Sequence, residues 1–271
     1  MTSKFSLTLL TFLSCFALGC FFQSCTKEPG TQLVKVDIEK EFVISATETL
    51  SKQGSGITFQ IETNQLQSPT DTTIDCFLII ENKKLKLLLN GVVKGAGSGA
   101  PATKKAKALL STGALAGGFY DVEISLLNST ITNKGLLTVT DDQYSFSFST
   151  SDGFELPQRE IPKTPPSLIW GFAAYNDGAG SVLAKDFVEQ IKTWSQDAGA
   201  VKPKKYTFFD ASRGLSNLEI FTNSLLAPVE RVSFVRFYDK NLTALEDFVK
   251  SYRAAYPSVY VAMYASDGTQ W

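Results

Sequence analysis

The feature that most constrains this chain is an alternation of hydrophobic and polar residues that recurs between Leu33 and Thr150. It is clearest where aromatic residues at 144, 146 and 148 alternate with serines at 145, 147 and 149. Because successive side chains of a strand point to opposite faces, this pattern predicts antiparallel strands that each have one buried face.

Clusters of glycine and polar residues separate these predicted strands. They lie at 52–56, 90–101 and 141–143. Several short strands divided by such turns are typical of a β-sandwich. We therefore expect residues 33–154 to form an immunoglobulin-like β-sandwich domain.

A proline-rich segment follows the predicted sandwich. Residues 155–166 contain Pro157, Pro162, Pro165 and Pro166. Proline fixes φ and is poorly tolerated inside a helix or a central strand. The segment therefore predicts a stiff linker between two domains.

The pattern changes after this linker. Strand-like runs at 167–177, 205–212, 231–239 and 258–267 alternate with helix-like runs at 181–194, 216–226 and 243–257. In the first helical run, Leu183, Phe187 and Ile191 share one face. Alternation of strands and helices predicts a small α/β domain with a mainly parallel sheet over 167–271, which also corresponds to half of a β/α barrel.

Each of the four predicted strands in this domain is followed by an acid: Asp177, Asp210, Asp239 or Asp267. In a parallel sheet these residues lie along one edge, where ligands bind. Carboxylates there suit Mg²⁺ or Ca²⁺, or the acid and base of a glycosidase. Aspartate is also a favoured turn and N-cap residue, and we favour that interpretation.

Three tyrosines precede aspartates at the predicted strand ends. They are Tyr175, Tyr238 and Tyr264. An aromatic face beside a carboxylate is the chemistry of a carbohydrate site, although a packed core edge has the same composition. These tyrosines are therefore candidate glycan contacts.

Composition excludes several function classes. The chain has no histidine, which excludes Ser-His-Asp and Cys-His catalysis and histidine-ligated zinc or haem. Its 26 basic and 27 acidic residues give a net charge of −1, without the positive excess of nucleic-acid-binding proteins. We assign no catalytic residue, metal or cofactor, and expect no nucleic-acid partner.

The N-terminus has the order of charge, apolar run and small residues. Lys4 precedes the mostly apolar stretch Leu7–Phe22. This order is typical of a removable secretory signal, and the run is shorter than the roughly 20 apolar residues of a membrane span. We predict a signal peptide over 1–24, with a retained membrane anchor as the alternative.

The end of this stretch resembles a type II, or lipoprotein, signal. A small residue precedes a cysteine at both Ser24-Cys25 and Gly19-Cys20. The polar residues after Cys25 suit a tether over 25–32. The resemblance implies lipidation of Cys25, with Cys20 as the alternative, and hence anchoring by buried acyl chains.

Two further stretches resemble known families. Residues 115–154, which include "GGFYDVEI" and "DDQYSFSF", resemble modules of secreted lipoproteins of the Bacteroidota. The stretch "FYDKNLTALEDFVKSYRAAYPSVYVAMYASDG" is similar to an early part of chitinase-like glycoside hydrolase barrels. The acidic catalytic motif of that family is absent, so this likeness implies a truncated or degenerate relative.

These observations predict an exported, membrane-anchored lipoprotein of the cell envelope, at the outer membrane or the cell surface. We expect a non-catalytic binding or structural role. Its expected partners are the membrane, through the lipid, and a glycan. The alternative is a truncated or degenerate glycoside hydrolase that acts on polysaccharide or glycoprotein glycans.

Overall fold

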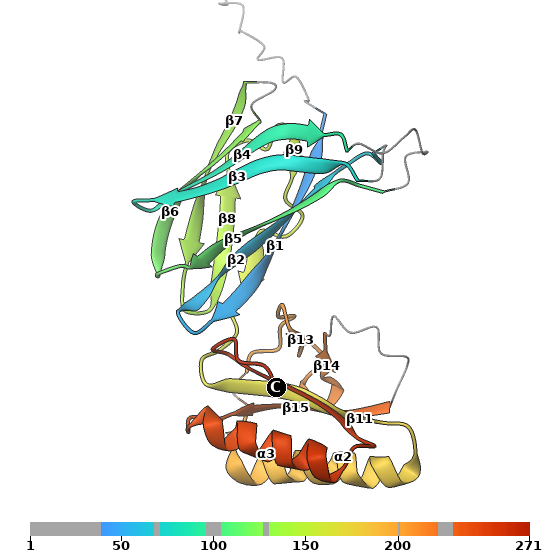
Figure 1. Cartoon of the computed structure of the whole chain (residues 1–271). Helices are drawn as coiled ribbons and strands as arrows, with labels where there is room; N and C mark the ends of the chain where they lie inside the picture. Colours follow the sequence, from blue (N-terminus) through green and yellow to red (C-terminus); the bar gives the residue numbers. More distant parts are fainter. Residues whose placement is uncertain (1–38, 68–70, 96–103, 127–129, 200, 222–229) are drawn as a thin grey trace, which may run out of the picture. The chain divides into compact units, whose positions relative to one another are not determined.

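The computed structural model describes residues 39–67, 71–95, 104–126, 130–199, 201–221 and 230–271. The predicted signal peptide, Cys20, Cys25 and the tether lie outside the described residues. Residues Ile38–Trp271 form one compact unit, which is mostly β and contains several sheets (Figure 1). The β-rich character of the predicted fold is thereby confirmed. Among the described helices, none has both the length and the apolar character needed to cross a membrane.

The first sheet has the strand order β5-β2-β1-β9. Its strands are β1 (Phe42–Ser51), β2 (Gly54–Thr63), β5 (Lys107–Ala114) and β9 (Phe154–Glu155). Strand β2 pairs antiparallel with β1 and β5, and β9 runs parallel to β1.

The second sheet has the order β10-β8-β7-β6-β4-β3. Its strands are β3 (Thr73–Glu81), β4 (Lys84–Val93), β6 (Gly118–Leu126), β7 (Ile131–Val139), β8 (Gln143–Phe148) and β10 (Glu160–Pro162). Strands β4 and β6 pair in parallel, because β5 joins the first sheet between them; the other pairs are antiparallel.

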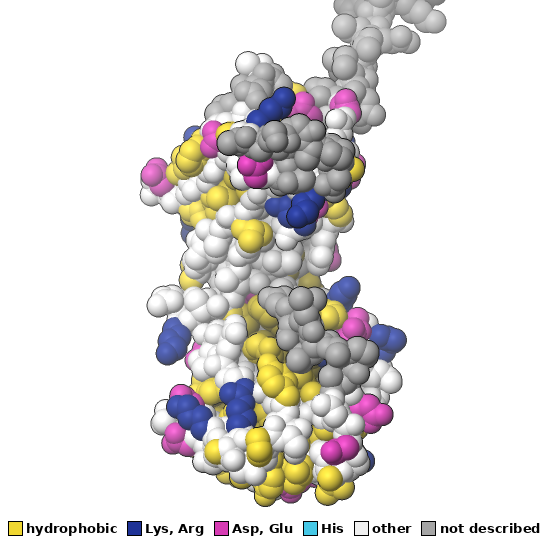
Figure 2. All heavy atoms as spheres, turned by 45° about the vertical axis from the view of Figure 1, so that its right-hand side comes forward, with side chains coloured by type: hydrophobic (Ala, Val, Ile, Leu, Met, Phe, Trp, Pro, Cys, Tyr) yellow, Lys and Arg dark blue, Asp and Glu magenta, His cyan; other side chains and the backbone are white. Residues whose placement is uncertain are grey.

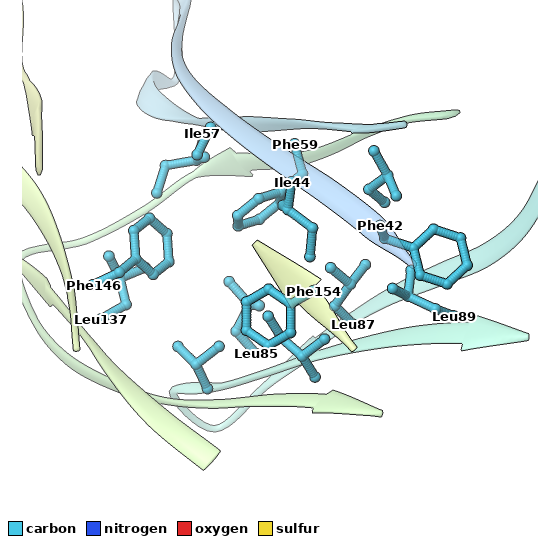
Figure 3. Packing of buried hydrophobic residues seen from close by; sticks show 14 of the residues in the cluster. Phe42, Ile44, Ile57, Phe59, Leu85, Leu87, Leu89, Leu137, Phe146 and Phe154 are labelled. Carbon is cyan, nitrogen blue, oxygen red and sulfur yellow. The ribbon is translucent and has the colours of Figure 1, made fainter. Parts of the chain in front are cut away.

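The first and second sheets share one hydrophobic core (Figure 3). The alternation of the sequence fills it: Phe42 and Ile44 of β1 and Leu85 and Leu87 of β4 are all buried. Phe59 of β2 meets Phe146 of β8 edge to face, with ring centroids 5.9 Å apart. Burying each such side chain contributes about 1.5–3 kcal/mol, so this core is a main source of stability.

The segment predicted to be a linker, 155–166, contributes strands to these sheets. Glu155 lies in β9, and β10 pairs with β8, placing Ile161 in the core. Its prolines remain compatible with pairing because β10 is an edge strand, where a missing N–H removes no central ladder bond. The segment is therefore packed against the sheets and is not a free spacer.

The third sheet has the order β12-β15-β11-β16. Its strands are β11 (Leu168–Tyr175), β12 (Gln196–Asp197), β15 (Glu230–Phe237) and β16 (Tyr260–Ala265). Helices α2 (Gly178–Trp194) and α3 (Leu242–Ala255) pack on one of its faces. Every pairing in this sheet is antiparallel, so the prediction of a mainly parallel sheet is wrong.

The path of the chain explains the reversal. Helix α2 returns the chain to the starting end of β11, where β12 pairs with the last residues of β15. Residues between 198 and 220 then pack on the face of β11 that is opposite to the helices. Strand β15 consequently begins beside Tyr175, at the finishing end of β11, and runs backwards along it.

The second predicted helix, 216–226, is also wrong over its described part. Leu215–Asn217 is a short 3₁₀ turn, and Glu219–Ile220 is strand β14, which pairs with β13 (Phe209–Asp210). Residues 222–226 lie outside the described residues. Ile220 is buried on the third sheet, so tertiary packing overrides the local helical preference of this segment.

Both faces of β11 are covered, which accounts for its continuous hydrophobic run. Ile169 and Ala173 pack with the helices. Leu168, Trp170 and Phe172 pack with the residues of the opposite face. A strand buried on two faces shows no alternation in sequence, and its run carries no information about its direction.

Candidate binding groove

The four predicted strand-end aspartates do not share one edge. Asp177 follows the end of β11, whereas Asp239 and Asp267 follow the ends of β15 and β16, which run in the opposite direction. Asp210 lies in the β13–β14 pair. Within the described residues, no three acidic or cysteine side chains are grouped as a metal site would require.

Three of these aspartates accept hydrogen bonds from the backbone of their own turn. Asp177 is the N-cap of α2, and its Oδ1 accepts from the Gly180 N–H at 2.6 Å. The Oδ1 atoms of Asp210 and Asp267 accept from residues 212 and 269 at 2.8 and 2.9 Å. Hydrogen bonds from the side chain and the backbone of Ser212 lower the pKa of Asp210. These are the turn and cap roles that aspartate commonly fills.

Asp239 and Asp267 remain together at one end of the third sheet. They line a cavity of about 210 Å³ with Ser266 and Tyr238. Ser266 closes the end of β11, since its Oγ accepts from the Leu168 N–H at 3.1 Å. This cavity is smaller than the roughly 300 Å³ at which ligand pockets usually begin.

The three predicted aromatic contacts lie apart. Tyr175 and Tyr238 pack with the helices, at opposite ends of β11. The Tyr238 hydroxyl donates to the Asn241 carbonyl at 3.0 Å, and burial raises the pKa of Tyr238. Tyr264 lies on the other face of the third sheet and stacks on Trp170, with centroids 6.0 Å apart and planes 16° apart.

Tyr264 belongs to a larger hollow, which we call the junction groove. Its volume is about 650 Å³, and it lies between the β1–β2 pair and the face of the third sheet that carries Trp170. The aromatic side has Trp170, Phe208, Phe221 and Tyr264, and the opposite wall has Thr47, Thr49, Thr58 and Gln60. Thr269 and Gln270 also line it.

The groove combines a fixed aromatic base with polar walls. Trp170 is only 2% exposed and also contacts Phe208, with centroids 5.5 Å apart. Thr49 and Thr58 bond to each other through their hydroxyls at 2.5 Å, which fixes their rotamers. Hydroxyl and amide groups here are able to donate and accept hydrogen bonds without a net charge.

Acids are scarce in this groove. Among the described residues that line it, Glu48 is the one acidic residue, and its carboxyl group is buried. Hydrolysis of a glycosidic bond ordinarily uses two carboxyl groups that flank the bond. The described lining thus offers one buried carboxyl group and several neutral hydrogen-bonding groups.

Sequence reasoning identified Tyr264 but missed the opposite wall. Thr47, Thr49 and Thr58 are at outward positions of the β1 and β2 alternation, where polar residues are ordinary. Folding brings them to the same groove as Trp170, which lies more than a hundred residues away along the chain. The local pattern contained no signal that these threonines face an aromatic surface.

The chain matches no protein-family model. No curated protein and no solved structure is significantly similar to it.

Proposed function

We propose that this protein is a membrane-anchored lipoprotein of the cell envelope that binds glycans in the junction groove without chemical conversion. The observation that carries the binding role is the stack of Tyr264 on Trp170, opposite a wall of threonine and glutamine. An aromatic face accepts the apolar face of a sugar ring, and neutral polar groups bond to its hydroxyls. The groove volume of about 650 Å³ lies within the usual range of ligand pockets.

A neutral ligand also agrees with the charge distribution. On the face in Figure 2, basic and acidic side chains are interspersed over the described surface. The sequence has almost equal numbers of both, 26 and 27. Neither feature favours nucleic acid, for which clustered positive charge supplies the affinity.

For the architecture, we propose an immunoglobulin-like sandwich over 33–154 followed by a small α/β domain over 167–271. The common core of the first two sheets supports the former, and the helices on one face of the third sheet support the latter. The lipid at Cys25 anchors the chain at the outer membrane or cell surface.

The glycan role is tested by binding of the purified full chain to an array of neutral and N-acetylated oligosaccharides. Tyr264→Ala is expected to weaken binding by about tenfold, the equivalent of about 1.4 kcal/mol of lost stacking. Tyr175→Ala is the matched control, because Tyr175 lies on the opposite face of the third sheet. Equal affinities of the wild type and Tyr264→Ala for every bound glycan would contradict the assignment.

The anchor is tested separately. Cys25→Ala should abolish incorporation of a palmitate analogue and release the protein from membranes, because acyl-chain burial provides the attachment. Normal labelling of this variant, followed by loss of label in Cys20→Ala, would move the lipid to Cys20.

The alternative function is a truncated or degenerate glycoside hydrolase. It is favoured by Asp239 and Asp267, which line the 210 Å³ cavity together, and by the resemblance of 237–268 to chitinase-like barrels. Release of product from chito-oligosaccharides, lost in Asp239→Asn and in Asp267→Asn, would establish this alternative. We expect no release.

A further inference from the structure

Glu48 places an ionisable group at a core position of β1. The buried face of this strand runs through Phe42, Ile44 and Ala46, and the period of two continues to Glu48. Its side chain is only 3% exposed. An acid at the end of a hydrophobic face is costly to bury, so its partners decide how it is tolerated.

The partners of Glu48 come from two other segments. Its Oε2 accepts from the N–H and the hydroxyl of Thr164, at 2.9 and 2.6 Å. Its own backbone N–H donates to the Thr207 hydroxyl at 3.0 Å. Thr164 follows β10, and Thr207 precedes β13. Glu48 of β1 thus bonds both to the segment around Thr164, which leads into the third sheet, and to the segment around Thr207, which packs on that sheet.

The other carboxyl oxygen, Oε1, is buried without a hydrogen-bond partner. A buried anion with an unsatisfied oxygen is much less favourable than a neutral carboxyl group. Burial raises the pKa of Glu48 to about 7, although the bonds from Thr164 and the charge of Lys163 act in the opposite direction. The Glu48 carboxyl group therefore changes from its protonated to its ionised form near neutral pH.

The neighbouring ionisable groups do not neutralise Glu48 by direct contact. The Lys163 ammonium donates to the Thr140 carbonyl at 3.1 Å and lies 5.4 Å from the centre of the Tyr144 ring. Burial raises the pKa of Tyr144 to about 12 and raises that of Tyr206, so both phenols stay neutral. Their hydroxyls donate to the Ser55 hydroxyl and the Lys202 carbonyl, respectively.

We propose that Glu48 is a proton-controlled latch: β1 stays packed against the segments of Thr164 and Thr207 while the buried carboxyl is neutral, and this packing loosens when the carboxyl is ionised. Ionisation strengthens the bonds from Thr164, but the cost of a buried charge with an unpaired Oε1 outweighs that gain. Ionisation makes hydration of Oε1 favourable, and water reaches it most readily where these segments separate. Glu48 and Thr207 both line the junction groove, so opening alters one wall of the groove. The latch concerns the fold itself and stands whether or not the groove binds a glycan.

The test is native-state hydrogen exchange of the full chain at pH 5 and pH 7.5, read at the Glu48 and Thr164 amides. Both amides donate bonds that the latch holds. After correction for intrinsic rates, the exchange rate of both amides should increase by up to about 50-fold from pH 5 to pH 7.5. The reason is that an ionised carboxyl group strongly favours the open, hydrated state over the buried one. Glu48→Gln keeps an acceptor for Thr164 but cannot ionise, so its exchange should not respond to pH.

Glu62→Gln is the matched control on the neighbouring strand. Glu62 pairs with Lys107 at 2.7 Å, and the bond from Lys107 lowers its pKa, so it does not titrate between pH 5 and 7.5. This variant should behave like the wild type. Equal corrected exchange of the wild type at both pH values, or an unchanged pH response in Glu48→Gln, would overturn the latch.

Discussion

Gly268 lies so close to Leu50 that a methyl group on its Cα would come within 2.7 Å of the Leu50 carbonyl oxygen. The turn after β16 and the end of β1 are therefore in backbone contact. Leu50 also packs against the hydrophobic cluster of Trp170 and Phe209. The first and third sheets therefore approach each other closely here, which is possible because residue 268 has no side chain.

Gly268→Ala should therefore destabilise the fold for two reasons. The φ of Gly268 is +84°, a region that costs other residues about 1–2 kcal/mol, and the new methyl group also displaces the Leu50 backbone. Gly113→Ala is the control, since its φ is +66° but no atom lies within 4 Å of the added carbon. Equal losses of unfolding free energy in urea for the two variants would indicate that the close approach of Leu50 adds no cost to the Gly268→Ala substitution.

Glu48 should make global stability fall as pH rises. Below pH 4.5 both the folded and unfolded carboxyls are protonated, and between 4.5 and about 7 only the folded one retains its proton. The loss should approach about 3 kcal/mol above pH 7, as an upper estimate, because each unit of pKa difference is equivalent to about 1.4 kcal/mol.

The measurement is urea unfolding at several pH values between 4.5 and 8. Glu48→Gln should remove this component and should be more stable than the wild type at pH 8. A wild type whose stability rises from pH 5 to pH 8, with the same rise in Glu48→Gln, would show that Glu48 does not titrate in this range.

Asp177→Ala should weaken α2 at its first turn. The variant loses the bond to the Gly180 N–H, and N-cap losses cost about 0.5–2 kcal/mol. Asp177→Asn should cost less, because asparagine also caps. Chemical unfolding of the two variants ranks them, and a greater loss with asparagine would point to the negative charge as the important property.

Trypsin should not cut the native protein after Arg159 or Lys163, which a free linker would expose. The Arg159 carbonyl accepts from the Phe146 N–H at 2.8 Å, and the Lys163 N–H donates to the Asp142 carbonyl at 2.8 Å. Both bonds must break before the segment can enter the active site of the protease. Mass spectrometry of a limited digest locates the cuts, and two stable pieces divided at these residues would support the linker interpretation instead.

Ca²⁺ or Mg²⁺ should leave the melting temperature unchanged. Asp177, Asp210 and Asp267 are engaged with the backbone of their own turns, and Asp177 is at the other end of β11 from Asp267. A cation that bound only the folded state would stabilise it. Calorimetry with and without an excess of either ion decides the question, and a rise in melting temperature that Asp239→Asn removes would establish a site in the 210 Å³ cavity.

The sequence was most informative where structure depends on neighbours along the chain. The alternation at 144–148 places Tyr144 and Phe146 in the core, and Leu183, Phe187 and Ile191 lie on the packed side of α2. The expectation that strand-end aspartates serve turns agrees with three of the four.

By itself, the sequence determined which residues face a core, because periods of two and 3.6 residues are local properties of strands and helices. Only the tertiary structure decided that β15 runs against β11, since a strand buried on both faces has the same composition in either direction. It likewise decided that Thr47 and Trp170 line the same groove, because that arrangement depends on where distant segments pack.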